Sequence, residues 1–481
     1  MEQVQGLAAA SRAIFKQARI DYWNETSGHS PTWSRVRSYY RRRLIEIYSF
    51  IVPRGMRVLE LGCGAGDLLS AVAPSRGVGL DIAPAMVAEA KARHPALHVV
   101  EADAETHGLD ERFDYILASD LLNELWDVQA MLERLLPLCH PQTRLLLNVH
   151  SNLWQSPRWL AVRLGLARPQ MAQNWLTPED VTNLLHLAGF EVIRWSSELL
   201  WPLRTPGWDA LCNRVLVRLW PFYLLGLTNL VIARPVSRAP LPEAIVSVVV
   251  PARNEAGNVA EIFDRVPAMG RGTELIFVEG GSTDDTYGAI EREMAVRQRA
   301  LTQLLRQTGK GKGDAVRLGF AHATGEVLMI LDADLTVAPE DLPRFYEAWR
   351  SSKGDCINGV RMVYPMGERA MRFANLVGNK AFSLAFSYLL GQRVKDTACG
   401  TKVLSRTHYA LVATSRAQFG NLDRFGDWDL LLGAAKFNLK IVDMPIRYHE
   451  RVYGQTKMQR WRIGWLLLRM VVLGLWRLKF V

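Results

Sequence analysis

The sequence predicts an α/β protein with two doubly wound domains and a C-terminal amphipathic helix. Short apolar runs alternate with helical patterns from Met56 to about Asn148, and a second alternation of this kind starts at Ile245. Such alternation is typical of a parallel sheet with helices on both faces. Between the two stretches, residues 234–243 contain three prolines, which is typical of a linker. We therefore expect the domain boundary there.

Length and composition agree with this organisation. At 481 residues the chain exceeds what one hydrophobic core usually supports, and 49% apolar with 22% charged residues describes an ordinary globular protein. The five cysteines show no C-x-x-C spacing, which argues against a disulfide framework or a zinc site and suits a reducing cytosol. Residues 1–10 lack the basic and apolar regions of a signal peptide. The cysteines are Cys63, Cys139, Cys212, Cys356 and Cys399.

Each expected element follows from a local pattern. A threonine cap followed by proline starts a helix at Thr177, and Gly189 ends it. Residues 229–233 are expected to form a closing strand at the edge of the first sheet. The other strands expected in the first half are Arg57–Leu61, Val78–Asp81, His98–Ala102, Tyr115–Ala118, Arg144–Val149 and Phe190–Trp195. Those expected in the second half are Ile245–Val250, Glu274–Val278, Leu301–Leu305, Glu326–Leu331 and Cys356–Val360.

These patterns divide the chain into five regions. They are a helical N-terminal extension (1–50), a first α/β domain (51–235), a linker (236–244), a second α/β domain (245–450) and a basic amphipathic tail (451–481).

The tail has the composition of a helix that lies in a membrane interface. From Arg451 to Val481 there are seven Lys/Arg, no Asp/Glu and three tryptophans, and the arginines share one helix face opposite an apolar face. A C-terminal helix packed on its own domain is the alternative. No uncharged run approaches the roughly 20 residues that a membrane span needs. The net charge is +10, but no motif supports a nucleic-acid partner.

The first domain carries a glycine loop after its first strand and acids after the next two. Gly62, Gly64 and Gly66 would present backbone N–H groups to a cofactor. Asp81 ends the second strand, where a carboxylate can accept hydrogen bonds from both ribose hydroxyls. Asp103 ends the third strand, where it could reach an adenine amino group.

This region, about residues 35–235, resembles the class I S-adenosylmethionine (SAM)-dependent methyltransferases. Glu60–Gly66 stands for their E/D-x-G-x-G-x-G motif, and the resemblance assigns the ribose to Asp81 and the adenine to Asp103. A dinucleotide oxidoreductase is the competing interpretation, which the G-x-G-x-G spacing disfavours. The cofactor-binding residues expected are Glu60, Gly62, Gly64, Gly66, Asp81 and Asp103.

The methyl acceptor cannot be read from the sequence. Asp120, Asn123, Glu124 and His150 all follow strands at the carboxyl edge, and any of them could act as a base toward a hydroxyl or amine. A SAM-binding scaffold without catalysis is the alternative for this half.

The second domain carries four polar segments in order, each next to an expected strand. They are Pro251–Glu255, Glu279–Thr286, the basic glycine loop Lys310–Gly313, and Asp332-Ala333-Asp334. A basic glycine loop suits a diphosphate. Two carboxylates one residue apart can hold Mg²⁺ or Mn²⁺ against it.

This order resembles the family 2 glycosyltransferases of the GT-A fold, and within them the dolichyl- or polyprenyl-phosphate mannose and glucose synthases. The resemblance runs from about Ile245 to Met458, and includes a D-T-x-C-G-x-K run that starts at Asp396. Gly280 departs from the family's second acid, which leaves the nucleotide base open, and Thr401 replaces its usual Phe. The residues expected to bind a nucleotide-sugar are Pro251, Arg253, Asn254, Glu255, Glu279, Lys312 and Asp332.

The resemblance implies an inverting transfer to a polyprenyl phosphate. Asp332 and Asp334 would bind the metal that neutralises the leaving diphosphate. A phosphate acceptor is already an anion, so it needs cations and no general base. If the acceptor is a neutral hydroxyl, Asp429 or Asp427 would have to take its proton. The cations expected at the acceptor phosphate are Arg361, Arg372, Arg451 and Lys457.

The leading hypothesis is therefore a bifunctional enzyme, a SAM-dependent methyltransferase joined to a metal-dependent polyprenyl-phosphate glycosyltransferase. We expect a cytoplasmic protein, peripheral on the inner face of the membrane. The alternative is a glycosyltransferase that acts on a glycan or small-molecule hydroxyl, with the first half a scaffold. A processive polysaccharide synthase is disfavoured, because Lys457 stands in place of the glutamine of its Q-x-x-R-W motif and spanning helices are not expected.

Overall fold

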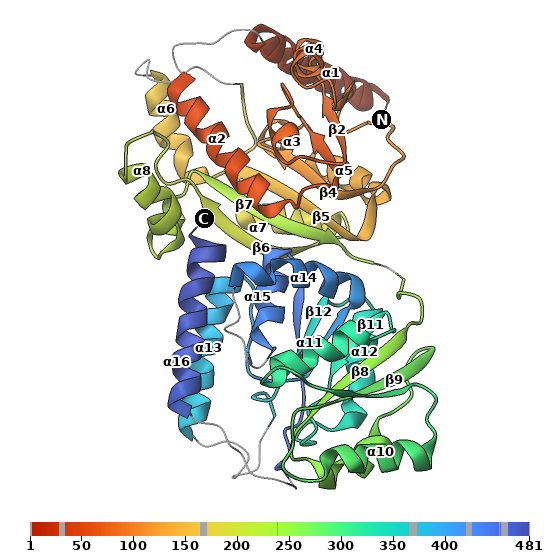
Figure 1. Ribbon diagram of the computed structural model, residues 1–481. Coiled ribbons are helices and arrows are strands. Elements are labelled where there is room, and N and C mark those ends of the chain that lie inside the picture. Colours follow the sequence, from red (N-terminus) through yellow and green to blue (C-terminus); the bar gives the residue numbers. More distant parts are fainter. Residues whose placement is uncertain are drawn as a thin grey trace. The chain divides into compact units, whose positions relative to one another are not determined.

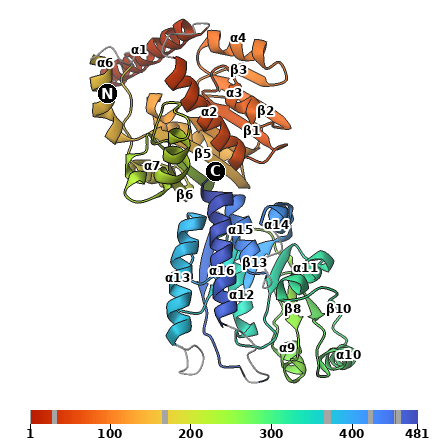
Figure 2. The same ribbon diagram turned by 60° about the vertical axis from the view of Figure 1, so that its left-hand side comes forward.

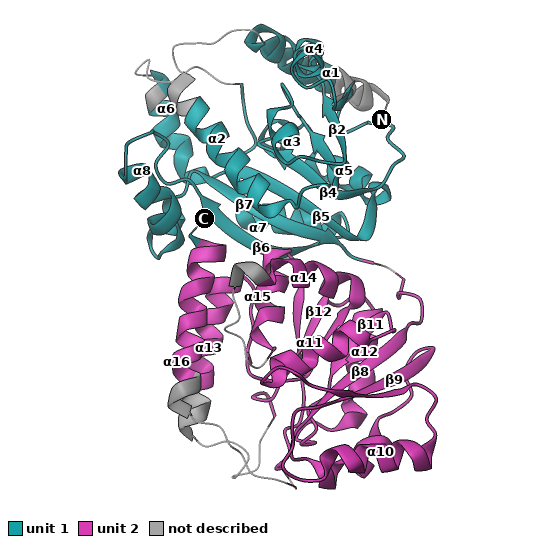
Figure 3. Cartoon of the chain, viewed as in Figure 1, with its two compact units in different colours: residues 1–236, 480–481 teal, residues 237–479 magenta. Residues whose placement is uncertain are grey.

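The chain folds into two compact units that each contain one seven-stranded sheet (Figures 1 and 3). Unit 1 comprises residues 1–236 and 480–481, and unit 2 comprises residues 237–479. The structure is a computed structural model, which describes residues 2–27, 34–163, 171–237, 239–364, 373–419, 426–451, 453 and 460–480.

The sheet of unit 1 has the strand order β3-β2-β1-β4-β5-β7-β6. All neighbouring strands pair in parallel except β7, which runs antiparallel to both β5 and β6. The strands are β1 (Arg57–Leu61), β2 (Arg76–Asp81), β3 (His98–Glu101), β4 (Phe113–Ser119), β5 (Cys139–His150), β6 (Phe190–Glu198) and β7 (Thr228–Pro235).

The expected place of residues 229–233 at a sheet edge is wrong. β7 lies between β5 and β6, so that β6 forms the edge. The reason is burial, because the side chains of Leu230, Val231, Ile232 and Ala233 are at most 2% exposed on both faces of the sheet. A run of consecutive buried apolar residues is typical of an interior strand.

Helices cover both faces of this sheet, which confirms the doubly wound class (Figure 1). Alternate residues of β1 face opposite ways: Val58 packs with Tyr48 of α2, whereas Leu59 packs in the cluster that contains Met131 of α5 and Leu185 of α7. The helices are α1 (Glu2–Thr26), α2 (Ser34–Ile51), α3 (Asp67–Ala71), α4 (Pro84–Arg93), α5 (Val128–Leu135), α6 (Gln155–Arg163), α7 (Pro178–Leu187) and α8 (Trp208–Ala210). Short 3₁₀ or π segments are η1 (Leu122–Glu124), η2 (Leu136–Leu138), η3 (Asn152–Trp154), η4 (Leu211–Val215), η5 (Leu216–Arg218) and η6 (Phe222–Leu225).

The expected helix start at Thr177 is confirmed and has a capping box. The Thr177 hydroxyl accepts a hydrogen bond from the Asp180 N–H at 3.1 Å, and the Asp180 carboxylate accepts one from the Thr177 N–H at 2.9 Å. Pro178 occupies the first turn, where its missing N–H costs no hydrogen bond.

The sheet of unit 2 has the strand order β10-β9-β8-β11-β13-β12-β14. β13 runs antiparallel to both of its neighbours, and the other pairs are parallel. Every strand expected from the sequence is present, and β13 and β14 were not expected. The strands are β8 (Ile245–Ala252), β9 (Gly272–Glu279), β10 (Thr302–Arg306), β11 (Val327–Ile330), β12 (Cys356–Val360), β13 (Lys402–Ser405) and β14 (Ile441–Pro445).

Two apolar clusters cover the faces of this sheet, one with α9 and α12 and the other with α11 and α15. The helices of unit 2 are α9 (Val259–Arg265), α10 (Thr286–Arg297), α11 (Lys312–His322), α12 (Leu342–Arg350), α13 (Phe373–Leu390), α14 (Arg406–Phe419), α15 (Trp428–Lys436) and α16 (Arg460–Gly474). Its short segments are η7 (Ala256–Asn258), η8 (Pro339–Asp341) and η9 (Leu475–Lys479).

The C-terminal helix α16 lies beside α13 (Figures 1 and 2). Leu467 and Met470 of α16 are buried in the same cluster as Phe386 and Leu389 of α13. The helix therefore packs on its own unit, while its outer side chains are exposed and its interfacial role stays a prediction. These exposed side chains are Trp465, Leu468 and Val472, and Trp476 of the following segment η9 is exposed as well. Within the described ranges, no helix is both long and apolar enough to cross a bilayer.

Candidate functional sites

The glycine loop of unit 1 has the backbone conformation that only glycine adopts easily. Gly62, Gly64 and Gly66 have φ angles of 65°, 52° and 79°. The loop joins the end of β1 to the start of α3, with Gly66 at the N-cap. A side chain at position 62 would contact Leu121, 3.0 Å away. The loop is therefore held as bare backbone that a cofactor can approach closely.

Asp81 at the end of β2 braces this loop. Its carboxylate accepts hydrogen bonds from the Gly64 N–H at 2.8 Å and from the Ala83 N–H at 2.9 Å. Burial raises the pKa of Asp81, and these N–H groups lower it. The structure thus brings Asp81 and the glycine loop together, as a cofactor site requires.

Glu60 is buried in β1 below the loop, with a side chain that is 3% exposed. Burial raises the pKa of Glu60 to about 8. In the described part of the chain, its Oε2 has no hydrogen-bond partner. Burial thus favours the protonated form of the Glu60 carboxyl group in the folded protein.

This pKa predicts a specific loss of stability with pH. An unfolded glutamate titrates near about 4.3, so only the folded state holds the proton between that pH and about 8. The free energy of unfolding should therefore fall as pH rises through this window, by at most about 1.4 kcal/mol per pH unit, and level off above it. We expect Glu60→Gln to flatten the dependence when denaturant unfolding is measured at pH 5.5, 7 and 8.5. The exposed Glu133→Gln is the control; an equal slope in wild type and Glu60→Gln would contradict the prediction.

Asp103 does not stand alone at the end of β3, because α1 covers it. Lys16 forms an ion pair with Asp103, and Arg12 forms one with the buried Glu105. The sequence predicted only a helical extension for residues 1–50. Two basic side chains four residues apart share one helix face, and this spacing could have indicated an acidic partner for the helix.

The residues suggested as bases gather at the ends of β4 and β5. His150 Nδ1 lies 3.4 Å from Asn123 Oδ1 and 3.8 Å from Asp120 Oδ1. Glu124 is set apart, because its carboxylate accepts a hydrogen bond from the Trp23 indole N–H at 2.8 Å. Tyr40 of α2, which the sequence analysis did not single out, donates to Asp120 at 2.7 Å.

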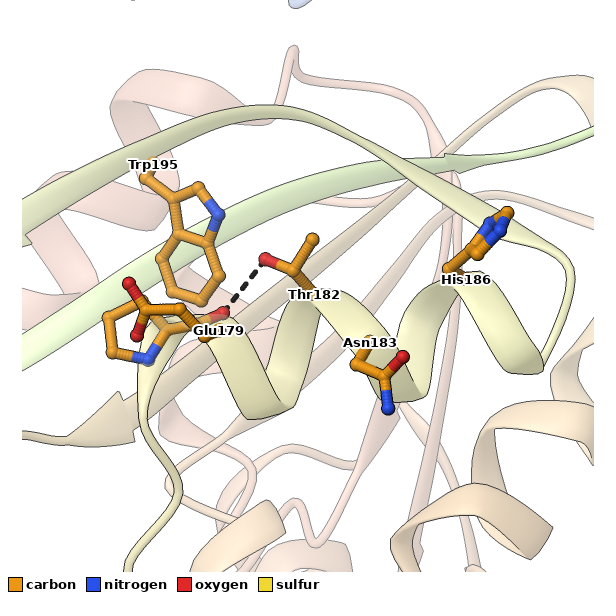
Figure 4. Close-up of a pocket in the computed structure, with 6 residues that line it drawn as sticks. Glu179, Thr182, Asn183, His186 and Trp195 are labelled. Carbon is orange, nitrogen blue, oxygen red and sulfur yellow. Dashed lines mark hydrogen bonds between the residues drawn. The ribbon is translucent and has the colours of Figure 1, made fainter.

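A separate pocket lies between α7 and β6 (Figure 4). Thr182 donates a hydrogen bond to the Pro178 carbonyl at 2.8 Å, while Trp195 covers the start of the helix. None of the expected site residues lines this pocket, and we assign it no role. The lining residues are Pro178, Glu179, Thr182, Asn183, His186 and Trp195.

In unit 2, Asn254 links the two loops that follow β8 and β9. Asn254 has a φ of 59°, and its side chain accepts a hydrogen bond from the Thr283 N–H at 2.7 Å. Glu279 at the end of β9 accepts one from the Ser282 N–H at 2.5 Å. Pro251 is the second-last residue of β8, just before the loop that contains Asn254, and Arg253 is exposed beside Gly280.

The centre of this site is a set of paired acids and cations. Lys312 Nζ lies 2.5 Å from Asp332 Oδ1 and 3.6 Å from Asp427 Oδ2. Arg451 lies 2.6 Å from Asp334 Oδ2 and 3.2 Å from Glu255 Oε1. The two acids expected to bind a metal therefore each face one of the cations expected at the phosphates.

Gly400 is necessary for the first of these pairs. A Cβ at this position would collide with both Asp332 Oδ2 and Lys312 Nζ. The glycine of the D-T-A-C-G run thus lets the backbone pass directly beside the acid–cation pair.

The acids have the right chemistry for a hard divalent cation. Both offer carboxylate oxygens, which Mg²⁺ and Mn²⁺ prefer. Among the described residues, no group of three or more His, Cys, Asp or Glu side chains is arranged to hold a metal ion. Asp332 and Asp334 therefore fit a site that is completed by oxygens of a diphosphate substrate and by water.

Glu255 adds a further charge that depends on pH. Burial and the neighbouring Asp334 raise the pKa of Glu255, Arg451 and Asn258 lower it, and the net result is a pKa of about 7. The net charge around Arg451 therefore changes near neutral pH.

The remaining residues expected at the site have different ion-pair partners. Asp427 lies within the Lys312 pair, whereas Asp429 lies 3.1 Å from Arg416. Arg361 uses Nε and Nη2 in a two-point contact with the fully buried Asp396, at 2.8 and 2.9 Å. Only its other N–H groups remain for an acceptor phosphate. Arg372 and Lys457 lie outside the described residues.

Two family models match the chain, one in each unit. Residues 33–194 match a methyltransferase domain, and residues 247–409 match glycosyl transferase family 2. Both resemblances inferred from the sequence are thereby confirmed.

Curated relatives match the glycosyltransferase half. An undecaprenyl-phosphate 4-deoxy-4-formamido-L-arabinose transferase of Klebsiella pneumoniae (strain 342) is 25% identical over 223 residues, which is 45% of this chain and 63% of that protein. Glycosyltransferase AglJ of Haloferax volcanii is 28% identical over 216 residues, which is 45% of this chain and 66% of that protein. The chain thus spans less than two thirds of these relatives' length.

Solved structures match each half separately. A glucosyl-3-phosphoglycerate synthase from Mycobacterium tuberculosis, in complex with Mn²⁺, UDP-glucose and glycerol 3-phosphate, is 19% identical with a TM-score of 0.37, covering 49% of this chain and 80% of that one. A magnesium protoporphyrin IX methyltransferase from Synechocystis is 17% identical with a TM-score of 0.33, covering 47% and 98%. By its family matches, the chain joins a methyltransferase domain to a family 2 glycosyltransferase domain in one polypeptide.

Proposed function

We propose that this protein is a bifunctional enzyme. Its second domain transfers a sugar, with inversion and with a divalent metal, from a nucleotide-sugar to a polyprenyl phosphate. Its first domain transfers a methyl group from SAM. The observation that carries the glycosyl-transfer proposal is the cluster in which Lys312 meets Asp332 and Arg451 meets Asp334. The undecaprenyl-phosphate transferase among the relatives supports the choice of acceptor.

The cluster contains what a diphosphate leaving group requires. A metal held by Asp332 and Asp334 would supply positive charge to the diphosphate. Lys312 and Arg451 then lose part of their carboxylate pairing and can face phosphate oxygens instead. A polyprenyl phosphate attacks as an anion, so no residue has to remove a proton.

The experiment is a transfer assay with the full chain. Radiolabelled UDP- and GDP-sugars are incubated with undecaprenyl phosphate and Mg²⁺ or Mn²⁺, with and without EDTA. We expect label to enter the organic phase only when a metal is present. Transfer to a glycan or small-molecule hydroxyl, with none to the lipid phosphate, would favour the alternative acceptor. Asp427, which lies beside Lys312, would then be tested as the base ahead of Asp429.

The methyl-transfer proposal rests on the glycine loop and Asp81. The loop offers backbone N–H groups, and Asp81 holds it by a hydrogen bond from the Gly64 N–H, while the Ala83 N–H fixes the other carboxylate oxygen. A SAM-binding scaffold would share these features. Only residues that act on the methyl acceptor would distinguish a methyltransferase from such a scaffold.

We also propose that the protein binds the inner face of the membrane as a peripheral protein, and an apolar surface of unit 1 supports this. It consists of residues 153–160 and 203–225, which the Trp154 indole N–H joins by a hydrogen bond of 2.9 Å to the Leu225 carbonyl. The two segments contain four arginines and one acid. Tryptophan, leucine and arginine together suit an anionic lipid surface. The exposed apolar side chains are Leu153, Trp159, Leu160, Leu203, Trp208, Leu211, Leu219, Trp220, Phe222, Tyr223, Leu224 and Leu225.

This surface predicts a contribution to vesicle binding. Trp220 is 78% exposed, and burying such a side chain in a bilayer interface is worth roughly 1.5–3 kcal/mol. We expect Trp220→Gln to weaken binding of the full chain to phosphatidylglycerol-containing vesicles by about tenfold, measured by co-sedimentation. The control is Trp126→Gln, which changes a 44% exposed tryptophan elsewhere in unit 1. Equal effects of both variants would count against this surface as the contact.

A further inference from the structure

A polar cluster at the ends of β4 and β5 is built around the Asp120 carboxylate. Oδ1 of Asp120 accepts hydrogen bonds from the Tyr40 hydroxyl at 2.7 Å and from the Asn148 amide. Asn148 in turn accepts one from the Tyr48 hydroxyl at 2.8 Å. Asp120 has a φ of 56°, an uncommon backbone conformation for a residue other than glycine. The carboxylate is therefore held in one place from several directions.

The imidazole of His150 is oriented by the same groups. It stacks on the Tyr40 ring, with centroids 6.0 Å apart and an interplanar angle of 19°. Its Nδ1 faces Asn123 Oδ1 at 3.4 Å and Asp120 Oδ1 at 3.8 Å. The Asn123 Nδ2 donates to the Asn174 carbonyl at 2.7 Å, which turns the amide oxygen of Asn123 toward the ring.

This arrangement places the proton of the neutral ring on Nδ1, because both atoms that face Nδ1 are acceptors. Nε2 then carries the lone pair, and no residue among those described donates a hydrogen bond to it. The side chain of His150 is 15% exposed and so is not fully enclosed.

The cluster lies at the same sheet edge as the glycine loop. β4 pairs with β1 through Ala118 and Leu61, and Leu121, next to Asp120, packs against Gly62. β4 also pairs with β5 through Ser119 and Asn148, two residues before His150. Alternate residues of a strand share a face, so His150 lies on the side of Asn148 and its Asp120 contact.

We propose that His150 is the general base of methyl transfer, that the acceptor is a neutral hydroxyl, and that Asp120 and Tyr40 are positioning residues. This inference rests on the proposed methyl-transfer function. In the reaction the hydroxyl oxygen forms a bond to the methyl carbon, the carbon–sulfur bond breaks, and its electron pair stays on sulfur. The hydroxyl proton passes to Nε2 of His150, which makes the products a methyl ether, S-adenosylhomocysteine and an imidazolium.

The charges around the site favour a neutral acceptor. The Asp120 carboxylate lies within the cluster, so an anionic acceptor such as a carboxylate would be repelled and would need no base. Arg158 of α6 is the opposing cation that influences His150. Burial lowers the pKa of His150, Asp120 raises it and Arg158 lowers it, so the ring is neutral at pH 7.

The first test measures the ring itself and needs no acceptor. In ¹⁵N NMR of the full chain at pH 7, we expect the His150 signals of a neutral ring with hydrogen on Nδ1. We expect Asp120→Asn and Tyr40→Phe to shift these signals. A protonated ring, or hydrogen on Nε2, would overturn the proposal without affecting the case for methyl transfer.

The second test measures transfer from methyl-tritiated SAM to a bacterial lipid extract. We expect His150→Gln to reduce the rate by about 10²–10⁴-fold, while the Kd for SAM changes less than twofold. The wild-type rate should rise with pH through an apparent pKa that is lower than the ordinary value of an imidazole, and the residual rate of His150→Gln should not. The control is His140→Gln at the opposite end of β5, where the ring contacts Asp114.

The outcomes separate the two proposals. A wild-type rate in His150→Gln, or a product that alkali hydrolyses as a methyl ester, would overturn the assignment of His150 while leaving methyl transfer established. Wild-type protein that binds no SAM would instead overturn the proposed function. Tyr40→Phe should keep the SAM affinity of wild type and lose about three- to tenfold in rate. It should also displace the acid limb of the pH–rate profile. If Tyr40 had a purely structural role, that limb would stay in place.

Discussion

Replacing Asp334 by Asn is expected to reduce the rate of sugar transfer by about 10²–10⁴-fold, with an equal result for Asp332→Asn. In the proposed reaction each carboxylate would supply a charged oxygen to the metal that stabilises the leaving diphosphate, a contribution of about 3–5 kcal/mol. Asp334 also faces Arg451 at 2.6 Å, and Asp332 faces Lys312 at 2.5 Å. The substitution therefore removes a metal ligand and releases a cation in the same step. The measurement is kcat with saturating donor and acceptor.

Two further measurements distinguish the loss of a metal ligand from the change of charge at the site. Raising the Mn²⁺ concentration should restore part of the rate if the lost oxygen was a ligand, and Mn²⁺ titration by electron paramagnetic resonance should show weaker binding. The control is Asp264→Asn, an exposed acid of α9 that pairs with Arg297. If Asp332→Asn and Asp334→Asn keep both the rate and the Mn²⁺ affinity of wild type, the metal site is elsewhere.

Asp81→Asn is expected to weaken SAM binding by about 10–100-fold. The carboxylate accepts from the N–H groups of Gly64 and Ala83, whereas an amide offers only one oxygen and sets its own NH₂ against the other N–H. Hydrogen bonds to a charged group contribute about 1.5–3 kcal/mol each, and a ribose hydroxyl would lose its acceptor as well. The measurement is the Kd for SAM by titration calorimetry, at a pH between 7 and 8.

The control for this prediction is Asp110→Asn, which changes an exposed acid in the same unit. Asp81→Asn should also make the glycine loop more mobile, which amide hydrogen exchange at residues 62–66 would detect. An unchanged Kd in Asp81→Asn would exclude Asp81 from the cofactor site. Lys16→Ala provides a complementary measurement, because it frees Asp103 without removing the acid.

The strands and the glycine loop were predictable because their signals are local. β12 begins and ends at the residues expected, and every expected strand of unit 2 is present. Gly62, Gly64 and Gly66 have the positive φ angles that a tight strand-to-helix turn needs. Such features depend on residues within one turn or strand, so spacing and residue type suffice to predict them.

The partners of the site residues were not predictable in this way. Arg451 and Asp334 lie 117 residues apart in sequence, and Tyr40 and Asp120 lie 80 apart. Nothing in the spacing of either pair indicates that they meet. The place of β7 between β5 and β6 was mispredicted although its run of apolar residues is typical of an interior strand, because the strands that pair with it are distant in sequence.

The sequence by itself therefore determined the two α/β domains, their families and the acids and glycines at the ends of their strands. Only the tertiary structure decided that Lys312 pairs with Asp332, that α1 covers Asp103, and that His150 lies beside Asp120. The physical reason is that local propensity and hydrophobic period act over a few residues, whereas charge pairing and proton transfer depend on distances that the packed chain alone defines.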